Sequence, residues 1–144
     1  MQIRKVVVGV DGSRNSDRAA SAAADIAELA GAEVVAVHAV GLLEGRPEAG
    51  EDRADRRAAL RHELDHRWTE TARRTGVRLR CELREGDAIS ALLGAASDVG
   101  ADLIVVGRQG HRAFPEQVLG STSAAVAASA RCPVLVIPDD PASD

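Results

Sequence analysis

Residues 6–13 of the chain read VVVGVDGS. A continuous run of β-branched residues is typical of a strand that is covered on both faces, as the strands of parallel sheets are. Asp, Gly and Ser directly after it are typical of a turn that leads into a helix. We therefore expect a central strand over residues 3–10 that passes through a tight turn into a helix.

The rest of the chain alternates short apolar runs with longer helical patterns. Strands are expected over residues 3–10, 33–40, 77–83, 103–106 and 134–137. Helices are expected over residues 16–30, capped by Ser13 or Ser16 and ended by Gly31, over residues 52–74, from the cap Asp87 to Gly100, and from Gly120 and Ser121 toward Pro133. Such alternation predicts an α/β fold with a parallel sheet and crossover helices.

Length and composition narrow the class of protein. A chain of 144 residues fits one domain, which we expect over residues 1–138, with a polar tail over 139–144. The net charge of -4 argues against a nucleic-acid surface, which needs clustered Lys and Arg.

The first strand leaves no room for a signal peptide, and no apolar run has membrane-spanning length. These features favour a cytoplasmic protein without a membrane partner, and Cys81 and Cys132 are interpreted as reduced core residues of strands.

The candidate binding residues follow strands, because open parallel sheets bind ligands beyond the carboxyl ends of their strands. Asp11-Gly12-Ser13 follows the first strand. Gly107 and Gly110 follow the fourth, and Gly120-Ser121-Thr122 stands at a helix start after nine intervening residues. Glycines let backbone amides approach a phosphate, and a helix amino terminus favours anions. The pattern indicates phosphate binding by Gly120, Ser121 and Thr122.

Two common nucleotide motifs are missing from the sequence. It has no Gly-Lys-Ser or Gly-Lys-Thr, which the usual phosphate loop of NTPases requires. After the first strand the only glycines are Gly9 and Gly12, so the three-glycine dinucleotide fingerprint is absent as well. A site for a nicotinamide or flavin dinucleotide of that class is therefore not expected.

Three segments together resemble the universal stress protein family over essentially the whole chain. They are residues 8–13, the long-spaced motif Gly107-x-x-Gly110-x9-Gly120-Ser121, and residues 132–136. The glycine motif is similar to that of the family's ATP-binding branch. The resemblance implies a five-stranded parallel sheet of order 3-2-1-4-5 with helices on both faces, like that of adenine nucleotide alpha hydrolases. It also implies a homodimer in which strand 134–137 pairs with its copy, which would cover an apolar edge.

The resemblance assigns roles to individual positions. Asp11 matches the acidic residue near the ribose and the metal-bound phosphates, Val10 the residue that lines the base, and Ala39 the small residue against the adenine. The positions that match phosphate and ribose ligands or flank them are Gly107, Gly110, Gly120, Ser121, Thr122, Val106 and Arg108. The implied ligand is ATP with Mg²⁺ or Mn²⁺. Residues 111–116 depart from the usual family pattern, and Pro115 in particular is expected to alter the loop shape.

Structural interpretations of the same residues stay open. Any one of the glycines can serve the turn geometry alone, and Asp11 can stabilise the turn or cap the helix. His62 and His66 have metal-ligand spacing but lie among charged residues, so we interpret them as a solvated face. Trp68 follows Leu60 and Leu64 at helical spacing, which favours core packing. His111 and Arg112 lie beside the glycine loop, where phosphate contact and no contact are equally open.

Three functions follow from these residues. The leading one is a stress-response sensor or regulator that binds ATP, works as a homodimer and acts on an unidentified protein partner. The second is a slow ATPase, although no residue stands out to orient an attacking water and none is assigned as catalytic. The third is a dimeric interaction module whose pocket is empty or takes AMP or a cyclic nucleotide.

Overall fold

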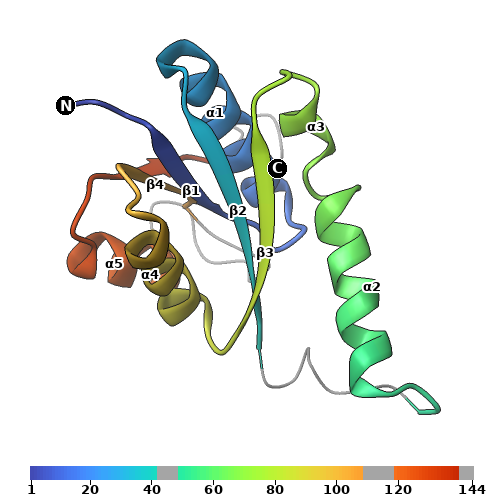
Figure 1. Ribbon diagram of the computed structural model, residues 1–144. Coiled ribbons are helices and arrows are strands. Elements are labelled where there is room, and N and C mark those ends of the chain that lie inside the picture. Colours follow the sequence, from blue (N-terminus) through green and yellow to red (C-terminus); the bar gives the residue numbers. More distant parts are fainter. Residues whose placement is uncertain (42–48, 109–118, 140–144) are drawn as a thin grey trace.

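The computed structural model describes residues 1–41, 49–108 and 119–139, and its centre is a five-stranded sheet (Figure 1). The strands are β1 (Lys5–Gly9), β2 (Glu33–Val40), β3 (Leu79–Glu85), β4 (Leu103–Gly107) and β5 (Val134–Ile137). All four pairings are parallel, and the order is β3-β2-β1-β4-β5. The predicted α/β class and the order 3-2-1-4-5 are confirmed. All five strands begin and end within two residues of the predicted bounds.

Helices cover both faces of the sheet. They are α1 (Arg14–Ala30), α2 (Arg53–Asp65), α3 (Glu70–Arg73), α4 (Ala88–Val99) and α5 (Ser121–Ser129). Figure 1 shows α4 and α5 together on one side, α1 across the sheet from them, and α2 alongside β3. The two layers have separate cores, one formed with α1, α2 and α3 and the other with α4 and α5.

The valines of β1 explain why this strand is central. Val6 and Val8 face the α1 layer, whereas Val7 faces the α4 layer, and all three are fully buried. Side chains of a strand alternate between faces, so a strand covered on both sides is apolar at every position. On the α1 side the contacting residues are small, namely Ala19, Ala20, Ala23, Ala24 and Ala27. This alanine face lets α1 lie close to the strands.

Several predicted helix ends are confirmed, among them Ser13, Gly31, Asp87 and Gly100. Ser13 is the amino-terminal cap of α1, and its hydroxyl oxygen accepts a hydrogen bond from the Ser16 backbone N–H at 3.2 Å. Asp87 caps α4 in the same way through Ser90. Gly31 ends α1 in the left-handed conformation with φ of 70°, which residues with a Cβ rarely adopt. These local rules therefore fix where the helices meet the strands.

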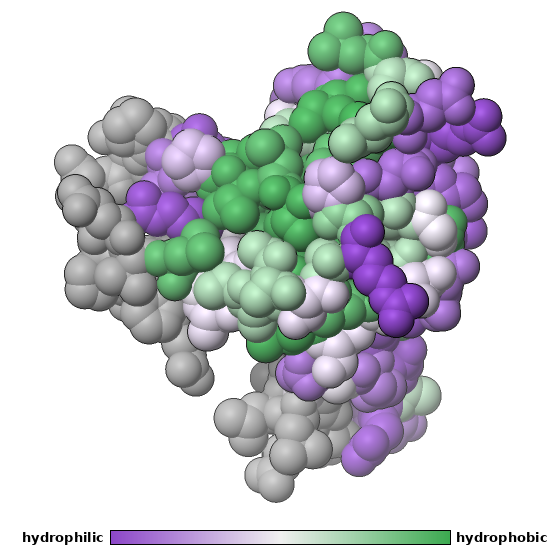
Figure 2. Space-filling view, turned by 90° about the vertical axis from the view of Figure 1, so that its left-hand side faces the viewer, coloured by the Kyte–Doolittle hydropathy of each residue, from purple (hydrophilic) through white to green (hydrophobic). Residues whose placement is uncertain are grey.

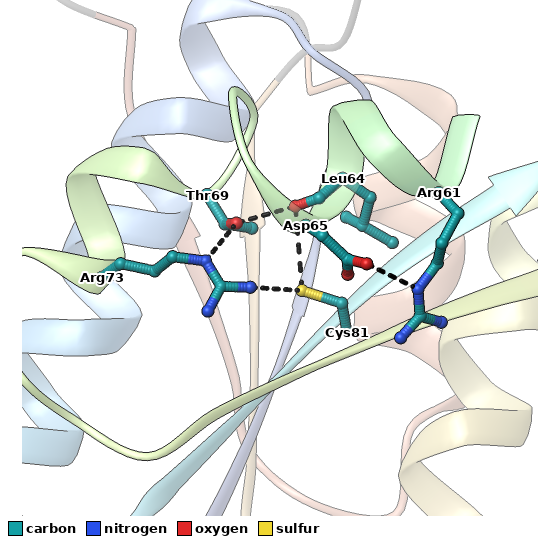
Figure 3. Close-up of polar contacts among 6 residues, drawn as sticks. All are labelled: Arg61, Leu64, Asp65, Thr69, Arg73 and Cys81. Atoms are coloured by element: carbon teal, nitrogen blue, oxygen red, sulfur yellow. Dashed lines mark hydrogen bonds and ion pairs between the residues drawn. The ribbon is translucent and has the colours of Figure 1, made fainter. Parts of the chain in front are cut away.

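The prediction of one helix over residues 52–74 is wrong. The chain leaves the helix after Asp65 and resumes a short one at Glu70. Buried Thr69 explains the break, because its hydroxyl donates to the Leu64 carbonyl at 2.7 Å and replaces the hydrogen bond that a continuing helix would make. The Cys81 thiol on β3 donates to the same carbonyl at 3.7 Å (Figure 3). The apolar spacing that suggested a continuous helix comes from residues that pack on the core through this turn.

The two cysteines differ in their surroundings. Both are free thiols, as predicted. Cys81 is buried on β3, but Cys132 precedes β5 and is only partly buried, so its predicted place in a strand core is wrong. Pro133 lacks a backbone N–H and directly follows Cys132, which is consistent with a strand that starts only at Val134. In the parts of the chain that the structure describes, none of the helices is long and apolar enough to cross a membrane.

Candidate functional site

The carboxyl ends of β1 and β4 are neighbours in the sheet, and this places the two predicted loops side by side. Val8 of β1 is in register with Val105 of β4, so both chains leave the sheet at the same edge. The start of α5 is held at this edge by two hydrogen bonds. The Gly120 N–H donates to the Arg108 carbonyl at 2.8 Å, and the Ser123 hydroxyl donates to the Gly107 carbonyl at 2.5 Å.

The turn after β1 is organised by Asp11. Its carboxylate accepts from the Ser13 N–H at 2.9 Å, and its own N–H donates to the Ser16 hydroxyl at 3.2 Å. Gly12 between them has φ of 82°. Asp11 therefore stabilises the turn, as one of the two interpretations of this residue expects. Its carboxylate is half-buried at the edge of the sheet beside β4.

Gly107 has a structural reason to be glycine. A Cβ built on it would lie 3.0 Å from the carbonyl oxygen of Asn15 in the first turn of α1. Backbone is a rigid neighbour, so a side chain here would push α1 away from β4. Close approach of α1 is enough to explain this position, with no ligand required.

The residues proposed to surround the base reach the same edge on different faces. Val10 is buried in the core of the α1 layer, and its N–H donates to the Val37 carbonyl on β2 at 2.9 Å. Ala39 of β2 is partly buried and packs on the α4 layer, as does buried Val106 of β4. A ligand that touched both Val10 and Ala39 would have to lie across the rim of the sheet.

The remaining candidates lie around the first turn of α5. Gly120 is buried, Ser121 is exposed and Thr122 is half-buried. Gly120 caps α5 without any side-chain hydrogen bond, unlike the residues that cap α1, α2 and α4. Since the first backbone N–H groups of a helix have no partner within it, α5 has amides suited to an anion. Gly110, His111, Arg112 and Pro115 lie outside the described residues.

Sequence reasoning missed a pair of rings beneath the Asp11 turn. His38 of β2 is buried, and its Nδ1 lies 2.7 Å from the Val10 carbonyl, which can only accept, so Nδ1 carries the proton. The ring of Trp68 lies 4.8 Å from that of His38. A polar residue in the apolar run of β2 was the available signal. Trp68 is partly buried and packs against the core, as predicted. From the same position it supports this edge of the sheet.

Metal-binding side chains are scarce over the described ranges, where no group of three or more His, Cys, Asp or Glu residues is placed to hold an ion. The rings of His62 and His66 are 4.5 Å apart on the exposed side of α2. An ion at the β1 and β4 edge would therefore need ligands from a bound phosphate in addition to a carboxylate such as Asp11.

The family of the chain follows from comparison with known proteins. Residues 2–138 match the sequence profile of the universal stress protein family. A universal stress protein of Thermus aquaticus is 36% identical over 93% of this chain and 98% of its own length, and one of Methanocaldococcus jannaschii is 33% identical over 93% and 81%. A universal stress protein solved in complex with cAMP aligns with a TM-score of 0.75 at 28% identity, over 97% of this chain and 100% of its own. The chain belongs to the universal stress protein family.

Proposed function

We propose that this protein binds an adenine nucleotide, ATP with Mg²⁺ or Mn²⁺, and acts as a sensor or regulator in a stress response. The observation that carries the proposal is the hydrogen bond from the Gly120 N–H to the Arg108 carbonyl, because it holds the start of α5, which has no side-chain cap, at the same edge of the sheet as the Asp11 turn. The first amides of a helix have no partner within it, and a neighbouring carboxylate can hold a phosphate-bound cation, so this edge of the sheet suits a polyphosphate. The relative solved with cAMP supports the adenine part of the ligand.

Each residue has a part in this proposal. The backbone amides of Ser121 and Thr122 would donate to phosphate oxygens, with the Ser121 hydroxyl as a further donor. Gly120, whose N–H is held by the Arg108 carbonyl, would let a phosphate approach the helix start without a side chain in the way. Asp11 would lie near the ribose and the phosphate-bound cation. Val10 and Ala39 would contact the base from the two faces of the sheet rim. The cation, when bound, neutralises phosphate charge and needs no separate protein cage.

Isothermal titration with ATP, AMP and cAMP, each with and without Mg²⁺, tests this proposal. Gly120→Val places a branched side chain at the helix start and is expected to abolish binding. Ala127→Val adds the same side chain to an exposed position near the other end of α5 and should bind like the wild type. Circular dichroism of both variants separates loss of binding from loss of folding. A wild type that binds none of the three nucleotides contradicts the proposal.

We also propose that β5 forms a homodimer with its copy. β5 lies at the edge of the sheet, and among the residues that the structure describes it pairs only with β4. Leu135 on this strand is 37% exposed, and Figure 2 shows apolar residues gathered on the side of the molecule that carries α5. Exposed apolar edge strands tend to pair with another chain. Light scattering should give a dimer for the wild type and a monomer for Leu135→Lys, and a monomeric wild type would refute this arrangement.

Binding rather than hydrolysis is proposed as the function. Hydrolysis needs a group that orients water or stabilises charge on the transferred phosphoryl group. The described residues at this edge offer amides, hydroxyls, the Arg108 guanidinium and the carboxylates of Asp11 and Asp139, which suit the binding of phosphate and a cation, and we assign none of them to orient an attacking water. Release of inorganic phosphate from ATP should therefore stay at the level of a buffer control when the protein is present in stoichiometric amount.

A further inference from the structure

Arg108 is tied to the end of β5. Its backbone N–H donates to the Ile137 carbonyl at 2.9 Å, which continues the β4 and β5 pairing past the last residue of β4. Two residues beyond Ile137 stands Asp139. The Nε of Arg108 lies 4.0 Å from the Oδ2 of Asp139, so the two side chains form an ion pair that is too long for a hydrogen bond.

This ion pair leaves buried polar atoms without partners. Nε and Nη2 of Arg108 and Oδ1 of Asp139 are shielded from solvent and make no hydrogen bond. Such atoms are rare in native proteins because each loses its hydration without compensation, and an ion or ligand that binds them is a usual explanation. A guanidinium with spare N–H groups is suited to a phosphate, which it can bind through two parallel hydrogen bonds.

Arg108 is also part of the proposed phosphate site. Its carbonyl accepts from the Gly120 N–H at the start of α5, and the residue before it is Gly107 at the end of β4. The side chain of Arg108 is 23% exposed, so the guanidinium is within reach of a ligand at this edge without being freely solvated. Asp139 thus places a carboxylate where the charge of a bound phosphate would compete with it.

We propose that Asp139 is the resident counter-ion of Arg108 and that a nucleotide phosphate displaces it. This inference rests on the proposed nucleotide binding. Two anions compete for the positive charge of one guanidinium, so the carboxylate weakens phosphate binding and a ligand with more phosphates competes better. When Arg108 turns to the phosphate, Asp139 loses its partner next to β5. Occupancy of the site is then transmitted to the strand edge at which the dimer is proposed to form.

The test compares Asp139→Asn with the wild type in titrations with ATP, AMP and adenosine. Asparagine keeps the shape of the side chain and removes the charge. The variant is expected to bind ATP about fivefold more tightly, the effect of one partly exposed ion pair, with a smaller gain for AMP and none for adenosine. Arg108→Gln should weaken the binding of ATP and leave the binding of adenosine unchanged. Adding Asp139→Asn to Arg108→Gln should produce no gain in affinity for ATP. Asp25→Asn, on the exposed side of α1, makes the same change in net charge and should bind like the wild type.

The outcomes separate the inference from the function on which it rests. Wild-type affinity of Asp139→Asn for ATP, a gain that is equal for adenosine, or a gain that persists with Arg108→Gln overturns the inference alone. Failure of every variant and of the wild type to bind any of the three compounds overturns the proposed function, and the inference with it. Thermal unfolding midpoints close to that of the wild type show that the variants are folded.

Discussion

The rings of Trp68 and His38 lie 4.8 Å apart and are tilted by 58° to each other. Trp68 comes from the turn between α2 and α3, and His38 from β2. Together they support the segment from Val10 to Gly12, since His38 donates to the Val10 carbonyl and a Cβ on Gly12 would lie 2.8 Å from Trp68 Nε1. The break in the predicted long helix is what brings the indole to the rim of the sheet.

Gly12→Ala should destabilise the protein more than Gly31→Ala. Both glycines have a left-handed φ, 82° and 70°, so both alanines incur a backbone strain of about 1 kcal/mol. Gly31 has open space around its Cβ position, whereas Gly12 would clash with Trp68, which adds roughly 1–3 kcal/mol. Urea unfolding measures both costs. Trp68→Leu in the Gly12→Ala background should remove the excess, and equal costs for the two alanines would show that Trp68 does not limit the turn.

Gly107→Ala should cost more stability than Gly94→Ala. The new methyl at position 107 meets the Asn15 backbone at 3.0 Å, and rigid backbone has to move, at a cost of about 1–3 kcal/mol. At position 94 the nearest atom is Nη1 of Arg84 at 3.3 Å, the end of a flexible side chain that can shift. Denaturant midpoints of the two variants compare these costs. If Gly107→Ala is as stable as the wild type, its glycine is explained by ligand binding and not by the approach of α1.

Asp102 makes stability depend on acid pH. The backbone N–H groups of Arg4 and Lys5 donate to its carboxylate at 2.8 and 3.1 Å and lower the pKa of Asp102 below its usual 3.8. Because the folded pKa is below the unfolded one, the carboxylate stabilises the fold above the usual value. This contribution is lost as the pH falls through 3.8 toward the lowered pKa.

Unfolding free energies measured from pH 7 to pH 3 check this dependence. Asp102→Asn should be less stable at pH 7 and should lose less stability on acidification than the wild type. Asp25→Asn makes the same change in net charge on an exposed helix face, and its unfolding free energy should change with pH as that of the wild type does. A wild-type slope for Asp102→Asn would mean that the two N–H contacts contribute nothing at neutral pH.

The two thiols should react in a fixed order with iodoacetamide. Burial raises the pKa of the Cys81 thiol, and the Arg73 guanidinium 3.4 Å from its sulfur opposes this only in part. Burial, with the Asp102 carboxylate, also raises the pKa of Cys132, but this residue is partly exposed. Mass spectrometry of the native protein should find Cys132 modified first and Cys81 modified only in denaturant. Equal rates in the native protein would contradict the buried position of Cys81.

The sequence predicted those features that depend on local rules. The valine run predicted that β1 is covered on both faces. The hydrogen bonding of Ser13 predicted the cap of α1, and the backbone freedom of Gly31 predicted its end; all three predictions are confirmed. The break before Thr69 did not follow, because a side chain that replaces a helix hydrogen bond leaves no signal in apolar spacing. Strand order came from the family resemblance, since alternation of strands and helices is compatible with several orders.

The candidate site was predictable only as a set of loops. Asp11 and Gly107 were named because they follow strands, and the adjacency of β1 and β4 then places them together. Three other features depend on tertiary packing. They are the clash between a Cβ on Gly107 and Asn15, the opposite faces of Val10 and Ala39, and the pairing of Arg108 with Asp139. No periodicity in the sequence encodes such contacts.

The central claim is that this chain binds an adenine nucleotide at the β1 and β4 edge. Its most direct test is mass spectrometry of the small molecules released on denaturation of the purified protein, quantified per chain, before and after incubation with ATP and Mg²⁺. The account predicts close to one adenine nucleotide per chain for the wild type and none for a folded Gly120→Val variant. A wild type that releases no nucleotide even after incubation would contradict it.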